Sequence, residues 1–184
     1  MTSREKKIQK WGKHRGRLID ALESNAYNNQ LDELKENLTL LRVDEFESNK
    51  NKLLFIALKS GSKECSEYLI EKEAKTNSQR VLNKCDFEKI DKVYELLSEL
   101  SNKYDFIRDS FHSDKKELIT RLIDPHKVKA NEKRINFLLK LLSDGFFEID
   151  EVRRIIDYEY EGKPEKKGMF LSVYREITLR ELGI

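Results

Sequence analysis

The chain has 184 residues, of which 38% are charged and 38% are hydrophobic, and its formal net charge is only +2. A charge so close to zero gives no general attraction to nucleic acid, and no apolar run approaches the ~18 residues that a membrane span needs. The hydrophobic residues recur every three or four positions, which is typical of helices with one buried face and not of disorder. With 7 glycines and 2 prolines, the chain lacks the frequent tight turns of an all-β fold. We therefore predict an all-α protein, and we expect it in the cytoplasm because no signal-peptide core follows Met1.

The first predicted helix spans residues 4–24 and has a basic face. Four cations recur on that face at helical spacing, namely Lys6, Lys10, Lys13 and Arg17. Such a row of cations binds phosphates or an acidic protein surface in some proteins and is a solvated helix face in others. Trp11 lies within the same segment, and a tryptophan beside charged groups is favoured at protein interfaces. Trp11 and the four cations are therefore candidate partner-binding residues.

A turn is expected at residues 25–30, because asparagine side chains compete with the helical backbone for hydrogen bonds. A second helix follows, with Leu31, Leu34 and Leu38 at helical spacing. Residues 44–50 are predicted to form a connector that leads into the most regular part of the chain.

That regular part, residues 51–77, contains two short helical patterns that meet at Gly61. Glycine permits a sharp reversal there because it adopts a positive φ without steric cost. The apolar positions of the two helices are Leu54, Ile56, Ala57 and Leu58, then Cys65, Tyr68, Leu69 and Ile70. Of these, Leu54, Ala57, Leu69 and Ile70 are predicted to hold the helices together as core residues.

This arrangement resembles an ankyrin repeat. The match lies in the length, in the apolar frame, and in Ala74 and Asn77 after the second helix. The positions of the family's Thr-Pro-Leu-His signature are occupied by Lys52, Leu53, Leu54 and Phe55. Glu73 stands where the family has a glycine. The resemblance implies that a partner is contacted by the connector before the repeat, so Phe46 in that connector is a further candidate partner-binding residue.

Segments on both sides of this stretch repeat its apolar pattern. Leu18–Leu22 matches Leu54–Leu58 at an offset of 36 residues, against about 33 in the family, and residues 82–97 match it again. Because one repeat cannot bury its own face, several must stack. We predict ankyrin-like helical pairs over residues 17–101, arranged as a short helical-hairpin solenoid, within a single helical domain over residues 1–184.

Helical hairpins and a cap are predicted for residues 102–184, after an amphipathic helix at 88–101. A short helix with Tyr104, Ile107 and Phe111 is followed by an N-cap at Ser113-Asp114 and a helix that ends before Pro125. The next helix starts at Asn131, carries Ile135, Leu138, Leu139 and Leu142, and has Gly145 as its C-cap. A helix with Val152 and Ile156, a loop over residues 159–168 and a last helix that reaches Leu182 complete the chain.

The residue types of catalytic and metal sites form no constellation in the sequence. The histidines lack the paired spacing of a zinc site: His14, His112 and His126. Cys65 and Cys85 are interpreted as buried free thiols of a reducing compartment. The acidic run from Asp157 to Glu161 is interpreted as solvated. We therefore predict that the protein is not an enzyme and uses neither a cofactor nor a metal.

The resemblance implies a non-catalytic protein–protein interaction module. We expect an adaptor, or a small inhibitor or effector, that binds and occludes a protein partner whose identity the sequence does not specify, without a membrane. The alternative is a nucleic-acid-binding protein that uses the basic face of residues 4–24. That alternative predicts binding that weakens steeply as the salt concentration rises.

Overall fold

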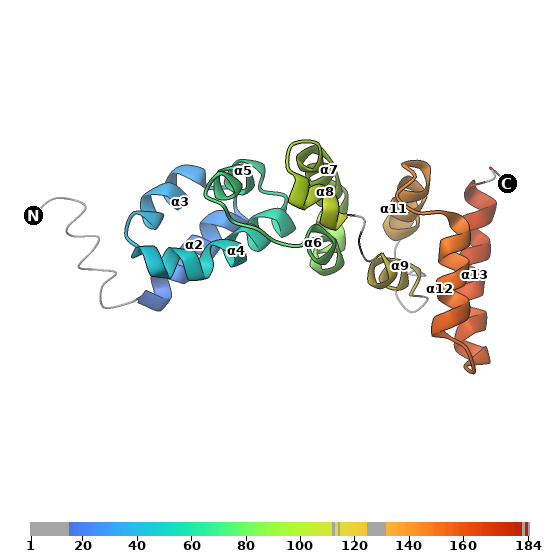
Figure 1. Ribbon diagram of the computed structural model, residues 1–184. Coiled ribbons are helices and arrows are strands. Elements are labelled where there is room, and N and C mark those ends of the chain that lie inside the picture. Colours follow the sequence, from blue (N-terminus) through green and yellow to red (C-terminus); the bar gives the residue numbers. More distant parts are fainter. Residues whose placement is uncertain (1–14, 112, 114, 125–131, 182, 184) are drawn as a thin grey trace, which may run out of the picture. The chain divides into compact units, whose positions relative to one another are not determined.

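A computed structural model describes residues 15–111, 113, 115–124, 132–181 and 183. These residues form helices and turns and contain no strand, which confirms the all-α class (Figure 1). The chain divides into two compact units, Met1–Phe111 and His112–Ile184. The division falls after Phe111, whereas the sequence placed its last boundary after Ser101, because the helix that ends at Phe111 packs against earlier helices of the first unit.

The first unit is built from short helices joined by tight connections. Its helices are α2 (Arg15–Tyr27), α3 (Leu31–Leu38), α4 (Val43–Ser60), α5 (Lys63–Glu71), α6 (Ser78–Lys84), α7 (Ile90–Ser101) and α8 (Asp105–Phe111), with a 3₁₀ turn at Phe87–Lys89 before α7. Helix α2 packs against α3, and α4 packs against α5. Helix α4 also packs against α2, α6 and α7, and α3 packs against α5, so successive helix pairs lie against one another.

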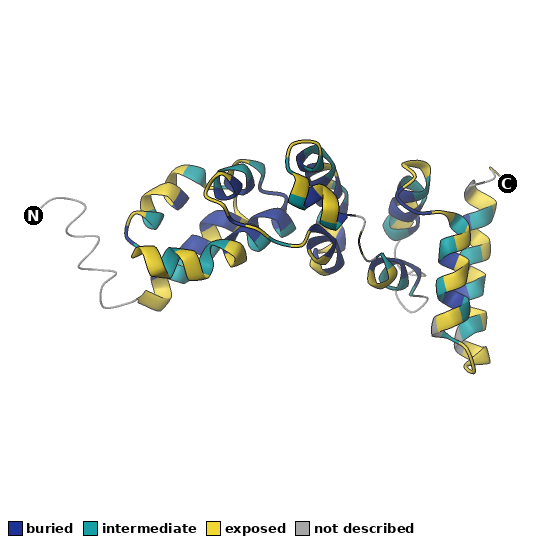
Figure 2. Cartoon of the chain, viewed as in Figure 1, coloured by how far each residue is buried: buried dark blue, intermediate teal, exposed yellow. Residues whose placement is uncertain are grey.

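The core of the first unit follows the predicted apolar periodicity. Figure 2 shows that the buried residues lie where neighbouring helices face each other, whereas the outer turns are exposed. The predicted core residues Leu54, Ala57, Leu69 and Ile70 are all buried.

The reversal at Gly61 is confirmed. Its φ is 72°, in the left-handed region that glycine adopts freely. The N–H of Gly61 bonds to the carbonyl of Leu58 at 3.0 Å, and the N–H of Ser62 bonds to that of Ala57 at 2.9 Å, which satisfies two of the last carbonyls of α4.

The turn expected at residues 25–30 begins later than predicted, because α2 continues to Tyr27. Asn25 is buried inside this helix. Its amide donates to Gln30 Oε1 at 3.1 Å, and its oxygen accepts from Asn37 Nδ2 at 2.8 Å. The side chain of Asn25 is thus satisfied by other side chains and does not compete with the helical backbone.

The connector expected at residues 44–50 is wrong, because α4 begins at Val43 and includes all of them. The carboxylate of Glu45 accepts a hydrogen bond from the backbone N–H of Arg42 at 2.8 Å. Arg42 itself can only donate, so this is one half of a capping box. Arg15 of α2 also lies 3.5 Å from Glu45. These contacts stabilise the first turn of α4, which the charged residues of this segment did not indicate.

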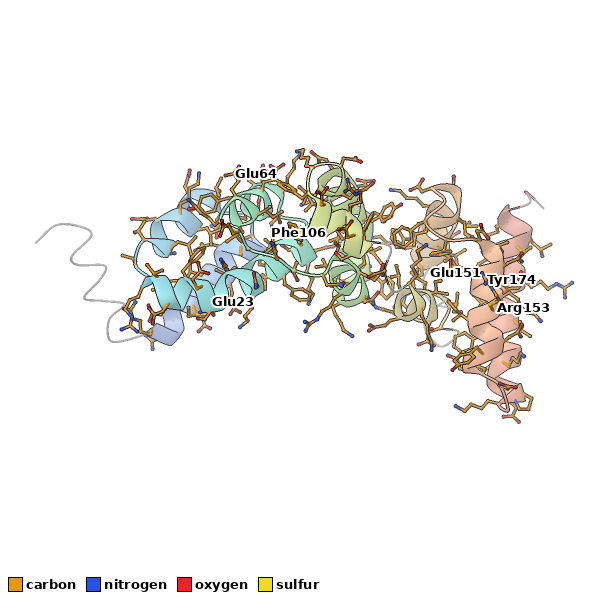
Figure 3. All side chains as sticks on the ribbon, in the orientation of Figure 1. Glu23, Glu64, Phe106, Glu151, Arg153 and Tyr174 are labelled. Carbon is orange, nitrogen blue, oxygen red and sulfur yellow. The ribbon has the colours of Figure 1, made fainter. Side chains whose placement is uncertain are left out.

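The side chain of Asn29 ties the first helix pair to the second. Its Oδ1 accepts a hydrogen bond from the N–H of Cys65 at 3.2 Å, and its amide group donates to Glu64, which is labelled in Figure 3. Cys65 is the third residue of α5, where the backbone N–H has no partner within the helix. Ser62, which precedes α5, donates its hydroxyl to the carbonyl of Tyr27 at 2.8 Å instead of capping. Asn29 therefore caps α5 from a different helix pair.

Replacing Asn29 by alanine should lower the free energy of unfolding by about 1–2 kcal/mol, because the change removes a cap and puts alanine, which tolerates the left-handed region less well than asparagine, at a φ of 58°. Glycine adopts the left-handed backbone freely, so Asn29→Gly should lower the free energy of unfolding only by the contribution of the cap. Urea unfolding followed by circular dichroism measures both variants. A wild-type midpoint for Asn29→Ala would contradict the capping role.

Ion pairs link α5 with α7 along the exposed side of the two helices. Lys63 lies 2.6 Å from Glu99, and Lys103 lies 2.9 Å from Glu67 and 3.3 Å from Glu99. The hydrogen bonds from the two ammonium groups hold the pKa of Glu99 below its usual value. Exposed pairs of this kind add little stability. Lys63 and Glu99 are 36 positions apart in the sequence, and so are Glu67 and Lys103. The hydrogen bond between Asn29 and Cys65 spans the same 36 positions.

The second unit contains four described helices. They are α9 (Lys116–Ile123), α11 (Glu132–Ser143), α12 (Ile149–Glu159) and α13 (Pro164–Glu181). Helix α9 packs against the other three, and α13 packs against both α11 and α12. The end of α9 before Pro125 is confirmed. The C-cap at Gly145 is also confirmed, because its φ is 66° and the N–H of Phe146 bonds to the carbonyl of Leu141 at 2.8 Å.

Two expectations for the second unit are corrected, and a third falls outside the described residues. Lys115, not Ser113 or Asp114, precedes α9, and its side chain makes no capping bond; Asp114 itself lies outside the described residues. The loop expected at 159–168 is shorter, because α13 begins at Pro164, a residue whose fixed φ suits the first turn of a helix. Leu182 lies outside the described residues.

The buried face of α11 is rotated from the predicted one. Its buried residues are Ile135, Phe137, Leu138 and Leu141. Leu139 and Leu142, which were expected to point inward, are only half-buried. The segment has apolar residues on both sides of the helix, so periodicity alone does not determine which side faces the core.

Candidate binding groove

A groove of about 270 Å³ lies in the first unit, where the connection between α3 and α4 meets α5. We call it the α3–α4 groove. Its lining residues are Lys35, Leu38, Thr39, Leu41, Arg42, Val43, Phe46, Tyr68 and Lys72. Four of them are aliphatic or phenyl side chains, one is a tyrosine and three are cations. The groove therefore combines an apolar floor with a basic rim.

The connection between α3 and α4 is held in a defined conformation. After α3 ends, the N–H of Leu40 bonds to the carbonyl of Asn37 and that of Leu41 to the carbonyl of Leu38, both at 3.1 Å. Leu40 is buried, and its carbonyl accepts a hydrogen bond from Arg15 of α2 at 3.0 Å. With Leu40 directed into the core, its neighbours Leu38 and Leu41 are left half-exposed along the groove.

The start of α4 supplies two more apolar side chains. Val43 is the first residue of the helix and is 80% exposed, the largest exposure of any described large hydrophobic residue. Phe46 follows three positions later, which places it on the same face of α4 as Val43. The N–H of Phe46 bonds to the carbonyl of Arg42 at 3.0 Å, so this first turn is regular. Covering a side chain as exposed as Val43 with another apolar surface is favourable, because it removes apolar area from water.

Tyr68 of α5 closes the groove and organises the cations on its rim. The ammonium group of Lys35 lies 5.2 Å from the centre of the Tyr68 ring, and that of Lys72 lies 5.6 Å from it. Cation–π contacts of this kind are weak at exposed sites. Neither ammonium group forms an ion pair within the part of the chain that the structure describes. Both positive charges are therefore available to a ligand.

Arg42 is the third cation of the rim. Its guanidinium lies 3.0 Å from the carboxylate of Asp44, and both side chains are about 70% exposed, at 70% and 69%. A pair so exposed to water is worth little and is readily exchanged for another carboxylate. The rim therefore has more positive than negative charge to offer to a ligand.

The structure brings one of the predicted partner-binding residues into this groove. Phe46 lies in it, although on a helix and not in a connector. Arg17 is exposed on α2 and is not among the residues that line the groove. The other four candidates, Lys6, Lys10, Trp11 and Lys13, lie outside the described residues.

Sequence reasoning missed most of the groove. Val43 was not singled out, and Tyr68 was assigned to the inward face of α5, where it is only half-buried. One local signal was present, because Lys72 follows Tyr68 by four positions and such residues meet on a helix surface. The contribution of Lys35 comes from another helix, so no local spacing indicates it.

Two other hollows are more polar. One of about 420 Å³ lies beside the connection from α5 to α6 and is lined by Asn51, Lys52, Phe55, Lys75, Thr76, Asn77 and Arg80. The other, of about 470 Å³, lies in the second unit and is lined by Ser113, Lys115, Lys116, Glu151, Arg154, Ile155 and Tyr158. Its cations are partly engaged: Lys115 donates to the carbonyl of Phe146, and Lys116 lies 5.0 Å from the ring centre of Tyr158. The lining of these hollows includes Phe55 in one and Ile155 and Tyr158 in the other, against five apolar or aromatic side chains in the α3–α4 groove.

Two further titratable groups outside the groove have shifted pKa values with structural causes. Burial raises the pKa of the Cys65 thiol to about 11, so this thiol is protonated and unreactive near neutral pH. The ammonium group of Lys167 lies 2.8 Å from the carboxylate of Asp157, which also accepts a hydrogen bond from Arg153 at 3.0 Å, and these contacts lower the pKa of Asp157. Arg153 also lies 5.7 Å from the ring centre of Tyr174, and both are labelled in Figure 3. Among the described residues, no three His, Cys, Asp or Glu side chains are placed to hold a metal ion.

No described helix combines the length and the apolar character that crossing a bilayer requires. Comparisons of the chain with protein-family models, with curated proteins and with solved structures find no match.

Proposed function

We propose that this protein is a non-catalytic interaction module that binds a protein partner through the α3–α4 groove. In this role it acts as an adaptor, or as a small inhibitor or effector that occludes the partner. One observation carries the proposal: the exposed Val43, the half-buried Phe46 and the ring of Tyr68 line a single hollow. Apolar and aromatic side chains gathered in this way are typical of the centre of a protein interface.

The architecture supports the proposal. The groove residues are held by helices that pack on one another, and Leu40 and Arg15 fix the connection between α3 and α4. A preformed surface binds with less loss of conformational entropy than a flexible one. We further propose that the helix pairs of the first unit are ankyrin-like repeats of a short helical-hairpin solenoid. Side-chain contacts that recur at an offset of 36 residues support this. Stacked repeats of this kind commonly present binding surfaces to other proteins.

Site-specific photo-crosslinking in the native host tests the proposed surface. A photoreactive phenylalanine analogue at Val43 should crosslink a discrete protein, because this position lies on the groove and is 80% exposed. The matched control is the same analogue at Leu179, which is 39% exposed in the second unit. The same adducts from both positions, or none from Val43, would contradict the proposal.

The variant Val43→Asp should weaken capture of the crosslinked protein roughly tenfold or more. The change removes an apolar contact worth about 1.5–3 kcal/mol when fully buried, and each 1.4 kcal/mol is a factor of about ten. An aspartate in the first turn of a helix is favoured by the helix dipole, so the fold should be retained. Circular dichroism and thermal unfolding of the variant check this. Unchanged capture by a folded Val43→Asp chain would remove Val43 from the interface.

A further inference from the structure

We infer that the segment bound in the α3–α4 groove is an acidic stretch of protein that inserts one bulky apolar side chain between its carboxylates. This inference rests on the proposed function and adds the chemistry of the partner. The floor and the rim of the groove each contribute one part of the argument.

The floor selects an apolar side chain. Leu38, Leu41 and Phe46 are half-buried and Val43 is exposed, so all four still present apolar surface to the groove. A leucine- or phenylalanine-sized side chain would cover that surface and displace the water above it. A phosphate or another small anion would leave the apolar floor uncovered and would itself lose hydration there.

The rim selects carboxylates on both sides of that side chain. Lys35 projects from α3 and Lys72 follows α5, and both ammonium groups reach the ring of Tyr68. The ring of Tyr68 is thus contacted by two cations that form no ion pair within the described chain. Lysine carries its charge on a flexible stem, so each ammonium can leave the ring to meet a carboxylate without moving the backbone.

Arg42 adds a third contact of a different geometry. Its guanidinium presents a planar fork that pairs with a carboxylate through two parallel hydrogen bonds. The carboxylate of Asp44 now lies 3.0 Å away and remains largely exposed. A partner carboxylate can therefore replace it or share the guanidinium. Complementary charges around an apolar centre fix the register of a bound segment and accelerate its association.

Peptide display on the whole chain tests the inference. Random twelve-residue peptides selected on the wild-type protein, with counter-selection on Val43→Asp, should yield sequences with one bulky apolar residue flanked by aspartate or glutamate. Fluorescence anisotropy then measures each enriched peptide against the double variant Lys35→Glu/Lys72→Glu. We expect affinity to fall about tenfold or more, because two attractive contacts become repulsive. Peptides in which the acidic residues are replaced by lysine should recover affinity for this variant.

The control variant Lys163→Glu/Arg175→Glu makes the same change in net charge at two exposed positions of the second unit. It should alter the affinity less than twofold, because neither residue lines the groove. An equal loss in both double variants would assign the effect to net charge and would overturn the inference.

The remaining outcomes separate the inference from the proposed function. Enriched peptides that require Val43 but are neutral or basic would overturn the acidic partner and leave the groove as a protein-binding surface. Selections that yield no peptide dependent on Val43 would overturn both. Binding of labelled single-stranded RNA that is lost in Lys35→Glu/Lys72→Glu, with no enriched peptide, would assign the groove to nucleic acid and overturn both.

Discussion

Replacing Leu54 by alanine should lower the free energy of unfolding of the first unit by about 2–5 kcal/mol. Leu54 is completely buried in α4. Helix α4 packs against α2, α5, α6 and α7, so the surroundings of Leu54 are held from several directions. A site held in this way cannot collapse fully around a smaller side chain, and the variant therefore loses both the transferred methyl groups and the contacts across the remaining cavity.

Urea unfolding by circular dichroism measures the loss, and amide hydrogen exchange locates it in α4 and α5. The matched control lies on the same helix: Val43→Ala shortens a side chain that is 80% exposed and should change stability by no more than about 0.5 kcal/mol. Because alanine has the higher helix propensity, the control cannot lose stability through its backbone. A Leu54→Ala chain as stable as Val43→Ala would show that α4 is not the centre of the core.

Replacing Phe137 by alanine should lower the free energy of unfolding of the second unit by about 3–5 kcal/mol. Phe137 is 1% exposed and is among the largest fully buried side chains of the described residues. It lies on α11, which packs against α9 and α13, so a lost ring affects three helices at once. The effect should exceed that of Leu54→Ala because a phenyl ring contributes more buried area than an isobutyl group.

The control for Phe137 is Asn136→Ala, one position earlier on the same helix and exposed. It should stabilise slightly or leave stability unchanged, since alanine is the better helix former. Phe137→Leu, which keeps most of the apolar volume, should lose much less than Phe137→Ala. Loss of amide protection in α11 and α13, measured by hydrogen exchange, reports the change. A Phe137→Ala chain as stable as the Asn136→Ala chain would show that Phe137 does not lie in the core of the second unit.

The sequence by itself determined the helical class, most helix positions and the core of the central helices. Apolar residues at a period of three or four place Leu54 and Leu69 inside, and a glycine with positive φ ends α4 at Gly61. These are local signals, because one turn of helix or one left-handed residue is specified by residues within four positions. Tertiary contacts did not have to be known for them.

Only the tertiary structure decided where α4 begins, which side of α11 is buried, and where the groove lies. The charged start of α4 is helical because Glu45 caps Arg42 and Arg15 of another helix lies beside it. The face of α11 is chosen by the helices that pack on it, since its apolar residues fit more than one register. The groove joins residues from α3, α4 and α5. Its apolar floor and basic rim arise from packing between segments distant in the chain, and spacing along one segment cannot encode such a juxtaposition.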